Sequence, residues 1–317
     1  MSYIRLVPNN TNIDFVGFRF ITFAISIIVI LSTLFAISFK GINYGIDFEG
    51  GYILEVRMTE TPDIPILREK LRNLNLGEVS MQQFGDDRNL LIRVEGKEDE
   101  KTDANENEPT TEAKKHSQVI DTIKETLGNQ NDFRKVETIG PKVGSELIAN
   151  SLKAVLLALA AMLIYIAVRF EWQFAVCGIV ALLHDTFAVL GLFSIFTFEF
   201  NETAIIAILI TDGYSINDSI VIFDRIRENI RKYKKMDLRT LINKSINETL
   251  SRTALTASTT LIALLALYIW GGNVISSFSL PIIIGIMIGS FSSICLAAPL
   301  LLYLNVKRGE TVVDTAP

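Results

Sequence analysis

Six long apolar segments constrain this 317-residue chain more than any other feature. A helix needs about 17 to 25 mostly apolar residues to cross the hydrocarbon core of a bilayer. Each segment is therefore predicted to be a transmembrane helix, and the fold class is an α-helical polytopic membrane protein. A soluble globular protein, a nucleic-acid binder and a disulfide scaffold all fit this pattern poorly. The six predicted helices cover roughly residues 18–39, 150–168, 173–195, 203–223, 254–270 and 279–304.

The first segment is expected to remain as a membrane anchor. It follows the positively charged residues Arg5 and Arg19. It is longer than the apolar part of a signal peptide and lacks a small-residue cleavage site, so it does not resemble a removable leader.

The positions of Lys and Arg predict the orientation of the helices. Eight of these residues lie in the stretch 224–250, and Lys307 and Arg308 follow the last segment. The connections at 198–202 and 271–273 contain neither residue type. Because loops rich in Lys and Arg stay in the cytoplasm, the first group is predicted to be cytoplasmic and the second external.

This orientation divides the chain between the two sides of the membrane. The N-terminus (1–17), the basic loop 224–250 and the C-terminal tail (305–317) are expected in the cytoplasm. Residues 40–149 then form an external domain, and the five helices within 150–304 form the main membrane domain. In a bacterium, this arrangement places the protein in the inner membrane with a periplasmic domain.

The basic stretch 224–250 has two interpretations. It is either an orientation signal that includes an amphipathic surface helix, or a helix that binds phospholipid headgroups through its positive charges. The simpler first interpretation is favoured by the sequence, and the second stays open.

The external domain is predicted to have a ferredoxin-like α+β fold. Alternating apolar residues indicate strands, and apolar residues at helical spacing indicate helices between them. The resulting order, β-α-β-β-α-β, is that of the ferredoxin-like unit. The charged stretch 96–113 has too few apolar groups to pack and is expected to be a flexible loop. The predicted strands are 51–58, 78–84, 89–95 and 132–139, with a turn at 85–89 and helices at 63–74 and around 119–127.

Sequence features of an enzyme are missing from this domain. It contains no metal-ligand cluster, no nucleophile–base pair and no phosphate-binding loop. Cys177 and Cys295 lie within apolar segments and are expected to be reduced packing residues. The chain is therefore expected not to be an enzyme and to use no cofactor.

The segment 45–51 joins the first helix to the domain and contains Gly45, Asp47, Gly50 and Gly51. Three glycines in seven residues indicate turns with positive φ or a close backbone approach. We interpret the segment as a hinge, with an ordinary membrane-to-domain junction as the alternative.

Charged residues inside the apolar segments indicate a functional site, because charges at this depth are costly. The fourth segment contains Asp212, Asn217 and Asp218, and the fifth follows Arg252. Asp218 and Arg252 are expected to lie at similar depths, where the geometry allows an ion pair between them.

Further polar residues accompany this pair. The third segment contains His184 and Asp185, and Thr256 and Thr259 follow Arg252 on one helical face. These residues, together with Asn217 and Asp212, are candidates for a supporting role.

Two roles are open for Asp218 and Arg252. Burial favours the protonated form of a carboxyl group, whereas a nearby cation favours the ionised form. Movement of Arg252 relative to Asp218 would therefore switch the acid between holding and releasing a proton. The alternative to this proton relay is a static salt bridge that holds the helices together.

Small residues recur at every fourth position of the last segment. Gly285, Gly289 and Ser293 would form a ridge that allows close contact with another helix. The contact lies either within the chain or with a partner.

These motifs together resemble the SecD/SecF family of protein-export membrane proteins. The segment 213–229, which begins Gly-Tyr-Ser-Ile-Asn-Asp-Ser, is similar to the signature of the smaller subunits of that family. The segments 45–51, 140–147 and 245–253 and the pair His184-Asp185 agree with the family in the same order.

The resemblance implies membership of the resistance–nodulation–division superfamily. It implies that the proton motive force drives a late step of protein translocation on the periplasmic side. Asp218 matches the proton-pathway aspartate of the family and Arg252 its functional arginine, whereas Asp212 matches no functional position. The implied partners are SecD, the SecY translocon with its accessory subunits, the YidC insertase, the translocating polypeptide and protons.

Two other functions compete with this one. A proton-driven exporter of small molecules or lipids would use the same membrane chemistry. A non-transporting scaffold of the translocon would use the polar membrane residues only to hold subunits together.

Overall fold

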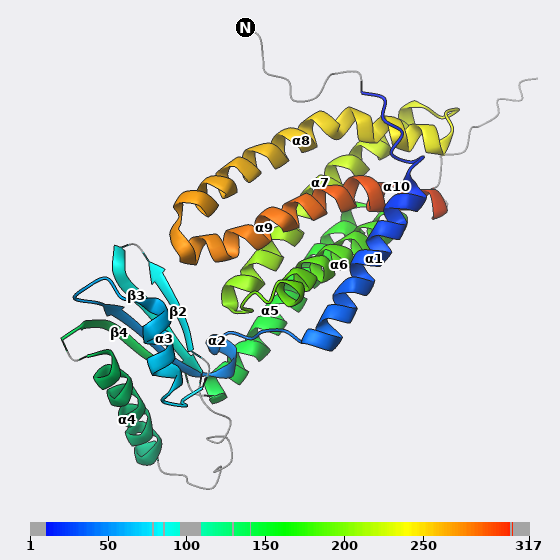
Figure 1. Ribbon diagram of the computed structural model, residues 1–317. Coiled ribbons are helices and arrows are strands. Elements are labelled where there is room, and N and C mark those ends of the chain that lie inside the picture. The colour runs from blue at the N-terminus through cyan, green and yellow to red at the C-terminus, as the bar shows by residue number, and fades with distance from the viewer. Residues whose placement is uncertain are drawn as a thin grey trace, which may run out of the picture.

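The computed structural model describes residues 11–77, 79–84, 86–95, 109–128, 130–139, 141–304 and 306. A bundle of long helices carries a small sheet domain at one end (Figure 1). Six helices in the described part are long and apolar enough to span a membrane, which confirms the predicted fold class. They are α1 (Arg19–Lys40), α5 (Pro141–Arg169), α6 (Trp172–Ile195), α7 (Glu202–Lys232), α8 (Leu238–Trp270) and a last helical stretch that begins with α9 (Gly272–Ser292).

The last helical stretch is irregular. α9 contains Pro281 and continues into a π-helical turn, η2 (Ser293–Ala297), and then into α10 (Ala298–Leu300) and η3 (Leu301–Tyr303). π-helical turns within α-helices frequently occur at functional sites. This one lies beside buried serines of the site described below.

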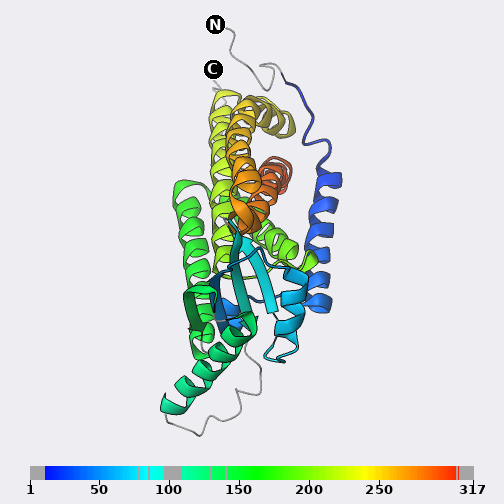
Figure 2. The ribbon, with the colours of Figure 1, turned by 60° about the vertical axis from the view of Figure 1, so that its left-hand side comes forward.

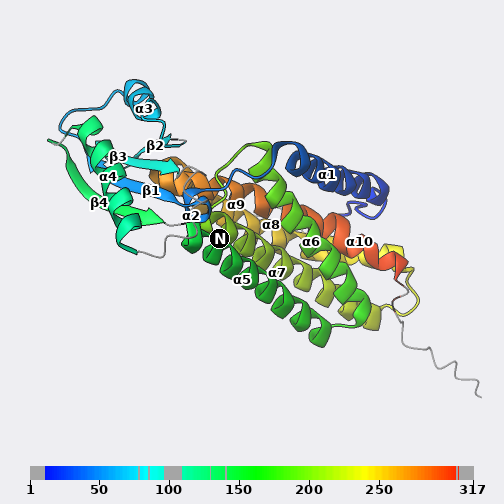
Figure 3. The same cartoon turned by 90° about the horizontal axis from the view of Figure 1, so that it is seen from below.

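The helices differ greatly in how much they are buried. In the apolar windows of α6, α7 and the last helical stretch, 61%, 44% and 56% of residues are buried, compared with 6% for both α5 and α8. α6, α7 and α9 therefore form the centre of the bundle. α5 and α1 lie on opposite sides of it (Figure 2), and α1 runs beside α6 (Figure 3).

The sheet domain has the predicted ferredoxin-like topology. Its four strands pair in the order β2-β3-β1-β4, and all three pairings are antiparallel. Strands β1 and β3 bury alternate side chains such as Leu54, Val56 and Ile92, which pack against Leu71 and Ile123 of the two helices. The elements are β1 (Gly51–Arg57), α3 (Ile64–Arg72), β2 (Val79–Phe84), β3 (Asp86–Glu95), α4 (Pro109–Leu127) and β4 (Asp132–Ile139).

Two connections in this domain were predicted to be longer than the structure shows. β3 already begins at Asp86, which pairs with Phe84 of β2, so residues 86–89 of the predicted turn 85–89 belong to the strand. Residues 109–113 of the predicted loop 96–113 belong to α4, and residues 96–108 lie outside the described part. Proline suits the first turn of a helix, which explains why α4 begins at Pro109 in spite of the polar sequence.

The stretch 224–250, predicted as a cytoplasmic loop that includes an amphipathic surface helix, is mostly helical. α7 continues to Lys232 and α8 begins at Leu238. Asp237 caps the start of α8 by accepting a hydrogen bond from the Thr240 backbone N–H at 3.2 Å. Buried Ile242 on α8 packs with α7 residues in one apolar cluster, so both helices continue beyond their apolar parts instead of ending there.

A short helix, α2 (Ile46–Glu49), occupies the glycine-rich junction and was not predicted. It lies between α1 and β1 and packs against the start of α5 (Figure 1).

Candidate functional site

A cluster of buried polar side chains lies at the centre of the bundle. Asp185, Asp212 and Asp218 are at most 2% exposed, and each comes from α6 or α7. Serines of α9 and η2 face them from the third central helix. Buried charges are rare in membrane helices and mark pathways for ions or protons.

Asp185 has the most complete set of partners. Its Oδ2 accepts hydrogen bonds from the hydroxyls of Ser215 on α7 and Ser292 on α9, the latter at 2.6 Å. Its Oδ1 lies 2.9 Å from His184 Nδ1. Asp185 therefore links α6 to both neighbouring helices.

Only one of the two carboxylate oxygens of Asp212 has a hydrogen-bond partner among the described residues. Its Oδ2 accepts a hydrogen bond from Thr186 Oγ1 at 2.8 Å. Its Oδ1, His184 Nε2 and Thr211 Oγ1 are buried without a hydrogen-bond partner among the described residues. Buried polar atoms without a hydrogen-bond partner are rare in folded proteins. In membrane helices, buried acids of this kind often mark a pathway for protons.

Asp218 faces α9. Its Oδ2 accepts a hydrogen bond from Ser290 Oγ at 3.3 Å, and the residue is 2% exposed. Asn217 next to it is exposed.

Asp218 and Arg252 form no ion pair within 4 Å in the described part of the chain, although the two charges are near enough to interact electrostatically. The two residues lie at matching distances from the turn between α7 and α8, as predicted. However, α7 directs Asp218 toward Ser290, whereas the exposed Arg252 lines a cleft on the outside of the bundle.

The two threonines predicted to share a helical face with Arg252 form hydrogen bonds within their own helix, α8. Thr256 Oγ1 donates a hydrogen bond to the Arg252 carbonyl at 3.1 Å, and Thr259 Oγ1 donates to the Leu255 carbonyl at 3.1 Å. Neither threonine reaches an acid of the cluster in this conformation.

The small-residue ridge of α9 packs within the chain. A Cβ atom added at Gly285 would collide with the Thr211 side chain, and one added at Gly289 would lie 2.8 Å from Ser215 Cβ. Ser293 Oγ donates a hydrogen bond to the Ser215 carbonyl at 3.0 Å. The close contact of α9 with α7 brings the serines within reach of the acids.

The glycine-rich junction is docked onto the membrane bundle. The Gly45 N–H donates to the Phe200 carbonyl at 2.9 Å, and the Phe200 N–H donates to the Asn43 carbonyl at 2.7 Å. Gly50 and Gly51 have φ values of 85° and 149°, a region that favours glycine.

Two further contacts hold this junction. A Cβ atom at Gly144 on α5 would collide with the Phe48 carbonyl, so α5 and α2 touch through their backbones. Asp47 is half-buried between these contacts. The segment interpreted as a hinge is therefore closely packed in this conformation.

An ion pair connects the sheet domain with the loop between α6 and α7. Arg93 Nη1 of β3 lies 2.7 Å from both carboxylate oxygens of Glu199. The side chains are 18% and 27% exposed, respectively. Because Glu199 lies just before α7, this pair joins the sheet domain to the helix that carries Asp212 and Asp218.

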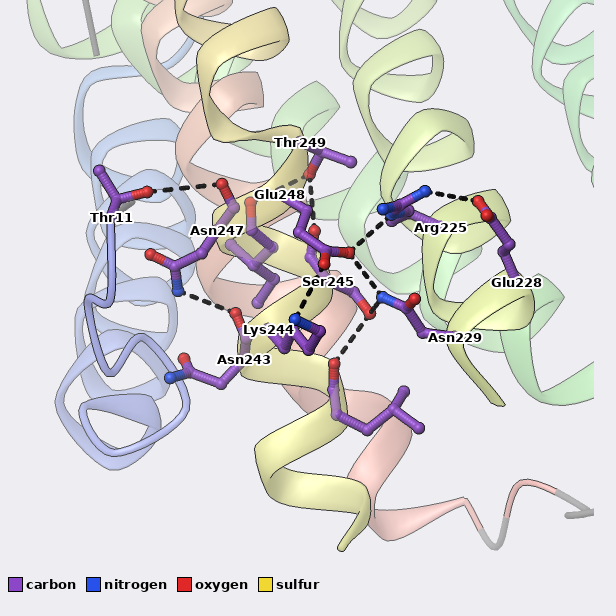
Figure 4. A network of polar contacts seen from close by, with 12 residues as sticks. Thr11, Arg225, Glu228, Asn229, Asn243, Lys244, Ser245, Asn247, Glu248 and Thr249 are labelled. Atoms are coloured by element: carbon purple, nitrogen blue, oxygen red, sulfur yellow. Dashed lines mark hydrogen bonds and ion pairs between the residues drawn. The ribbon is translucent and has the colours of Figure 1, made fainter. Parts of the chain in front are cut away.

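A second polar network joins α7 to α8 at the opposite end of the bundle (Figure 4). Glu248 accepts hydrogen bonds from Arg225 at 2.7 Å and from Asn229 at 2.8 Å, and it pairs with Lys244 at 3.1 Å. Asn229 also donates to Ser245 at 2.9 Å.

Several residues of the site were not predicted from the sequence. The hydroxyls of Thr186, Ser290 and Ser292 contact the acids, but an isolated hydroxyl in an apolar segment gives little signal. The regular spacing of small residues in the last segment was the available clue, because close helix contact places neighbouring serines at the interface. The pairing of Arg93 with Glu199 could not be predicted from a local sequence pattern, because the two residues are 106 positions apart.

Family profiles match most of the chain. The profile described as "Protein export membrane protein SecD/SecF, C-terminal" matches residues 118–307. The profile described as "SecD/SecF GG Motif" matches residues 35–62, which include the glycine-rich junction.

Curated relatives match over nearly their full length. The protein translocase subunit SecF of Rickettsia bellii is 44% identical over 311 residues, which cover 97% of this chain and 98% of the relative. The protein translocase subunit SecF of Rickettsia prowazekii is 43% identical over 315 residues, which cover 98% and 97%.

A solved structure has the same fold. The crystal structure of SecDF, a translocon-associated membrane protein from Thermus thermophilus, matches with a TM-score of 0.77 and 32% sequence identity. The match covers 94% of this chain and 39% of the longer SecDF chain. From the profiles, the relatives and the shared fold, the chain belongs to the SecF family of protein translocase subunits.

Proposed function

We propose that this subunit works with SecD to use the proton motive force for a late step of protein translocation and for release of the exported chain on the periplasmic side. The observation that carries the proposal is the buried carboxylate of Asp218, which lies in the centre of a transmembrane bundle and accepts a single hydrogen bond, from Ser290, in the described part. Such an acid is suited to take up and release protons. The subunit assists transport and is not itself an enzyme.

The structural match supports SecD as the partner. The chain corresponds to 39% of a SecDF protein, so that a second chain would supply the rest of the assembly. The SecY translocon with its accessory subunits and the YidC insertase are the further proposed partners, and the emerging polypeptide is the client.

The orientation proposed from the charge distribution fits this role. The termini and the turn between α7 and α8 would lie in the cytoplasm of a bacterial inner membrane. The sheet domain, within residues 40–149, would then face the periplasm, where the exported chain emerges. The membrane domain would comprise residues 150–304.

Arg252 is proposed as the movable partner of Asp218. It has no ion-pair partner among the described residues, and it lies level with Asp218 on the neighbouring helix. An approach of Arg252 would favour the ionised acid, and its withdrawal would favour the protonated acid. In the present conformation no ion pair joins the two residues, and the Arg252 charge acts on Asp218 only at longer range.

The energy available from one proton is sufficient to change a conformational equilibrium. A proton that moves through a potential of 100 mV releases about 2.3 kcal/mol. This free energy shifts a two-state equilibrium by about 50-fold.

α7 provides the path from the acids to the sheet domain. It begins three residues after Glu199, which pairs with Arg93 of β3, and it carries both Asp212 and Asp218. A displacement of α7 that follows proton transfer would therefore act on the sheet domain through this ion pair. The sheet domain would pull on the emerging chain or prevent it from sliding back.

The test is the variant Asp218→Asn in membrane vesicles that contain the complete Sec machinery. We expect that the stimulation of secretion by the proton gradient is lost while the complex with SecD still assembles. Glu202→Gln is the matched control, because Glu202 is an exposed acid at the start of the same helix. Undiminished stimulation in Asp218→Asn would exclude Asp218 from the mechanism.

Two further measurements, of assembly with SecD and of solute transport, distinguish the two competing functions. Loss of assembly with SecD in Asp218→Asn would favour the scaffold, in which the acid only holds subunits together. Proton-coupled transport of a small solute or lipid by the purified chain would favour an exporter.

A further inference from the structure

An open cleft of about 910 Å³ lies at the end of the bundle that is distant from the sheet domain. It is lined by the end of α5, the second half of α7 and the first half of α8. We propose that this cleft binds the phosphate headgroup of an anionic phospholipid. The proposal goes beyond the translocation function and does not depend on it.

The cleft carries an excess of positive charge. Its lining has three acidic side chains, Asp224, Glu228 and Glu248. It has twice as many basic side chains, so its formal charge is positive by three. The basic residues are Arg169, Arg225, Arg227, Arg231, Lys232 and Arg252.

Only some of these cations form ion pairs with the acids of the cleft. Arg225 pairs with Glu228 at 2.6 Å and with Glu248 at 2.7 Å. Arg169 pairs with Asp224 at 3.2 Å, and Arg227 lies 3.8 Å from the same carboxylate. Arg227 also donates a hydrogen bond to the Arg169 carbonyl at 3.2 Å and lies over the Phe170 ring.

The remaining cations are not engaged by the acids of the cleft, although Arg252 is near enough to Asp218 of α7 for the two charges to interact. Arg231 and Arg252 form no ion pair within the described ranges, and Lys232 contacts the Tyr233 ring at 5.3 Å. Several positive groups that converge on one concave surface without counter-charges favour the binding of an anion. Arginine in particular binds phosphate oxygens through two parallel hydrogen bonds.

The position of the cleft favours a lipid over a soluble anion. Arg169 ends the apolar helix α5, and Trp172 three residues later is 61% exposed. Arg and Trp at the end of a transmembrane helix are typical of the headgroup region of a membrane. The cleft therefore lies where phospholipid phosphates are concentrated.

Apolar surface continues from the cleft along the bundle. Val168 on α5 and Leu255 on α8 are 83% and 52% exposed, and Val221 of α7 lines the cleft itself. Acyl chains attached to a bound headgroup would extend along these side chains, whereas inorganic phosphate would leave them uncovered. A phospholipid would thus pair its phosphate with the cations of the cleft and cover the adjoining apolar side chains with its acyl chains.

The test uses the full-length chain in detergent, with native mass spectrometry to count bound lipids. The probes are dioleoylphosphatidylglycerol, which is anionic, and dioleoylphosphatidylcholine, which has no net charge. We expect the chain to retain phosphatidylglycerol preferentially. Equal retention of the two lipids would overturn the proposal.

Single variants locate the binding site. Arg227→Gln and Arg231→Gln should each weaken phosphatidylglycerol binding about fivefold, because one Arg near a membrane surface contributes about 1 kcal/mol. Arg231→Lys should keep most of the affinity, which shows that the loss in Arg231→Gln is not caused by misfolding. Lys235→Gln is the matched control, since this exposed lysine lies at the same end of the bundle but outside the cleft.

Three other results would contradict the proposal. An equal loss in Lys235→Gln would show a general surface potential without a defined site. Displacement of phosphatidylglycerol by inorganic phosphate would assign the cleft to a soluble anion. Loss of lipid binding after assembly with a SecD partner would assign the surface to a protein contact.

Discussion

Arg93 and Glu199 join the sheet domain to the membrane bundle through one guanidinium nitrogen that lies 2.7 Å from both carboxylate oxygens. The two side chains are largely shielded from solvent, unlike most ion pairs on the surface of the domain. Shielding strengthens the attraction between the charges, although it also makes the loss of one partner costly. The position of the domain therefore depends on this contact.

Removal of this ion pair should loosen the sheet domain from the bundle. In Glu199→Gln, Arg93 loses its counter-charge, and we expect faster hydrogen–deuterium exchange in the junction 41–50 while the sheet itself stays protected. Asp86→Asn is the matched control, because Asp86 forms exposed ion pairs within the domain. Unchanged exchange in the junction of Glu199→Gln would show that the backbone contacts alone hold the domain.

A methyl group at Gly285 should destabilise the membrane bundle. The new Cβ atom collides with Thr211, and overpacking of this kind costs about 1–3 kcal/mol. We expect Gly285→Ala to lower the thermal unfolding temperature in detergent. The double variant Gly285→Ala/Thr211→Ser removes one methyl group from the contact and should restore part of the loss.

Gly213→Ala is the control for this prediction. Gly213 lies on α7 close in sequence to Thr211, but an added Cβ atom has no neighbour within 4 Å. The better helix propensity of alanine, about 1 kcal/mol, should leave this variant at least as stable as the parent. Equal destabilisation of both variants would show that α9 does not approach α7 as closely as described.

Loss of the Ser292 hydroxyl should destabilise the centre of the bundle. Ser292→Ala removes a 2.6 Å hydrogen bond to the buried carboxylate of Asp185. Asp185 keeps its contact with Ser215, but a hydrogen bond to a charged group contributes about 1.5–3 kcal/mol, so the unfolding temperature should fall. Ser32→Ala on α1 is the control, because Ser32 is exposed and its hydroxyl donates a hydrogen bond to the Val29 carbonyl of its own helix. No difference between the two variants would contradict the bonding assigned to Asp185.

The charge of Arg252 should matter more than its shape if it acts as the movable partner of Asp218. Arg252→Gln is expected to abolish the proton-gradient stimulation of secretion, whereas Arg252→Lys should retain a measurable part of it. Arg239→Gln is the control, because Arg239 is a basic residue of the same helix that pairs with Asp14 at 3.1 Å. Full activity of Arg252→Gln would leave Asp218 without its proposed partner.

The sequence was sufficient to predict the architecture, because that depends on local patterns. The apolar segments predicted the six spans, and the alternation in residues 51–58 and 89–95 predicted two central strands. The order of the elements then determined the ferredoxin-like topology. Helix ends were less predictable, because the polar ends of α7 and α8 are stabilised by contacts between the two helices.

The site was predicted only in part. The acids Asp185, Asp212 and Asp218 are conspicuous in apolar segments, but the rotation of each helix about its axis is set by packing. That rotation directs Asp218 toward Ser290 and places Arg252 at the cleft, beyond ion-pair distance of Asp218, which equal depth alone did not predict. The ion pair of Arg93 with Glu199 depends on how two separate parts of the chain dock, and no local pattern encodes it.

α7 is a single helix of 31 residues, about 46 Å long at 1.5 Å per residue. One of its ends adjoins Glu199 and the other carries Arg225 and Arg231, while Asp218 lies near the middle. If this stiff rod tilted about its midpoint, its two ends would swing in opposite directions. An event at one carboxyl group would then reach both faces of the membrane at the same moment, without any signal passing from side chain to side chain.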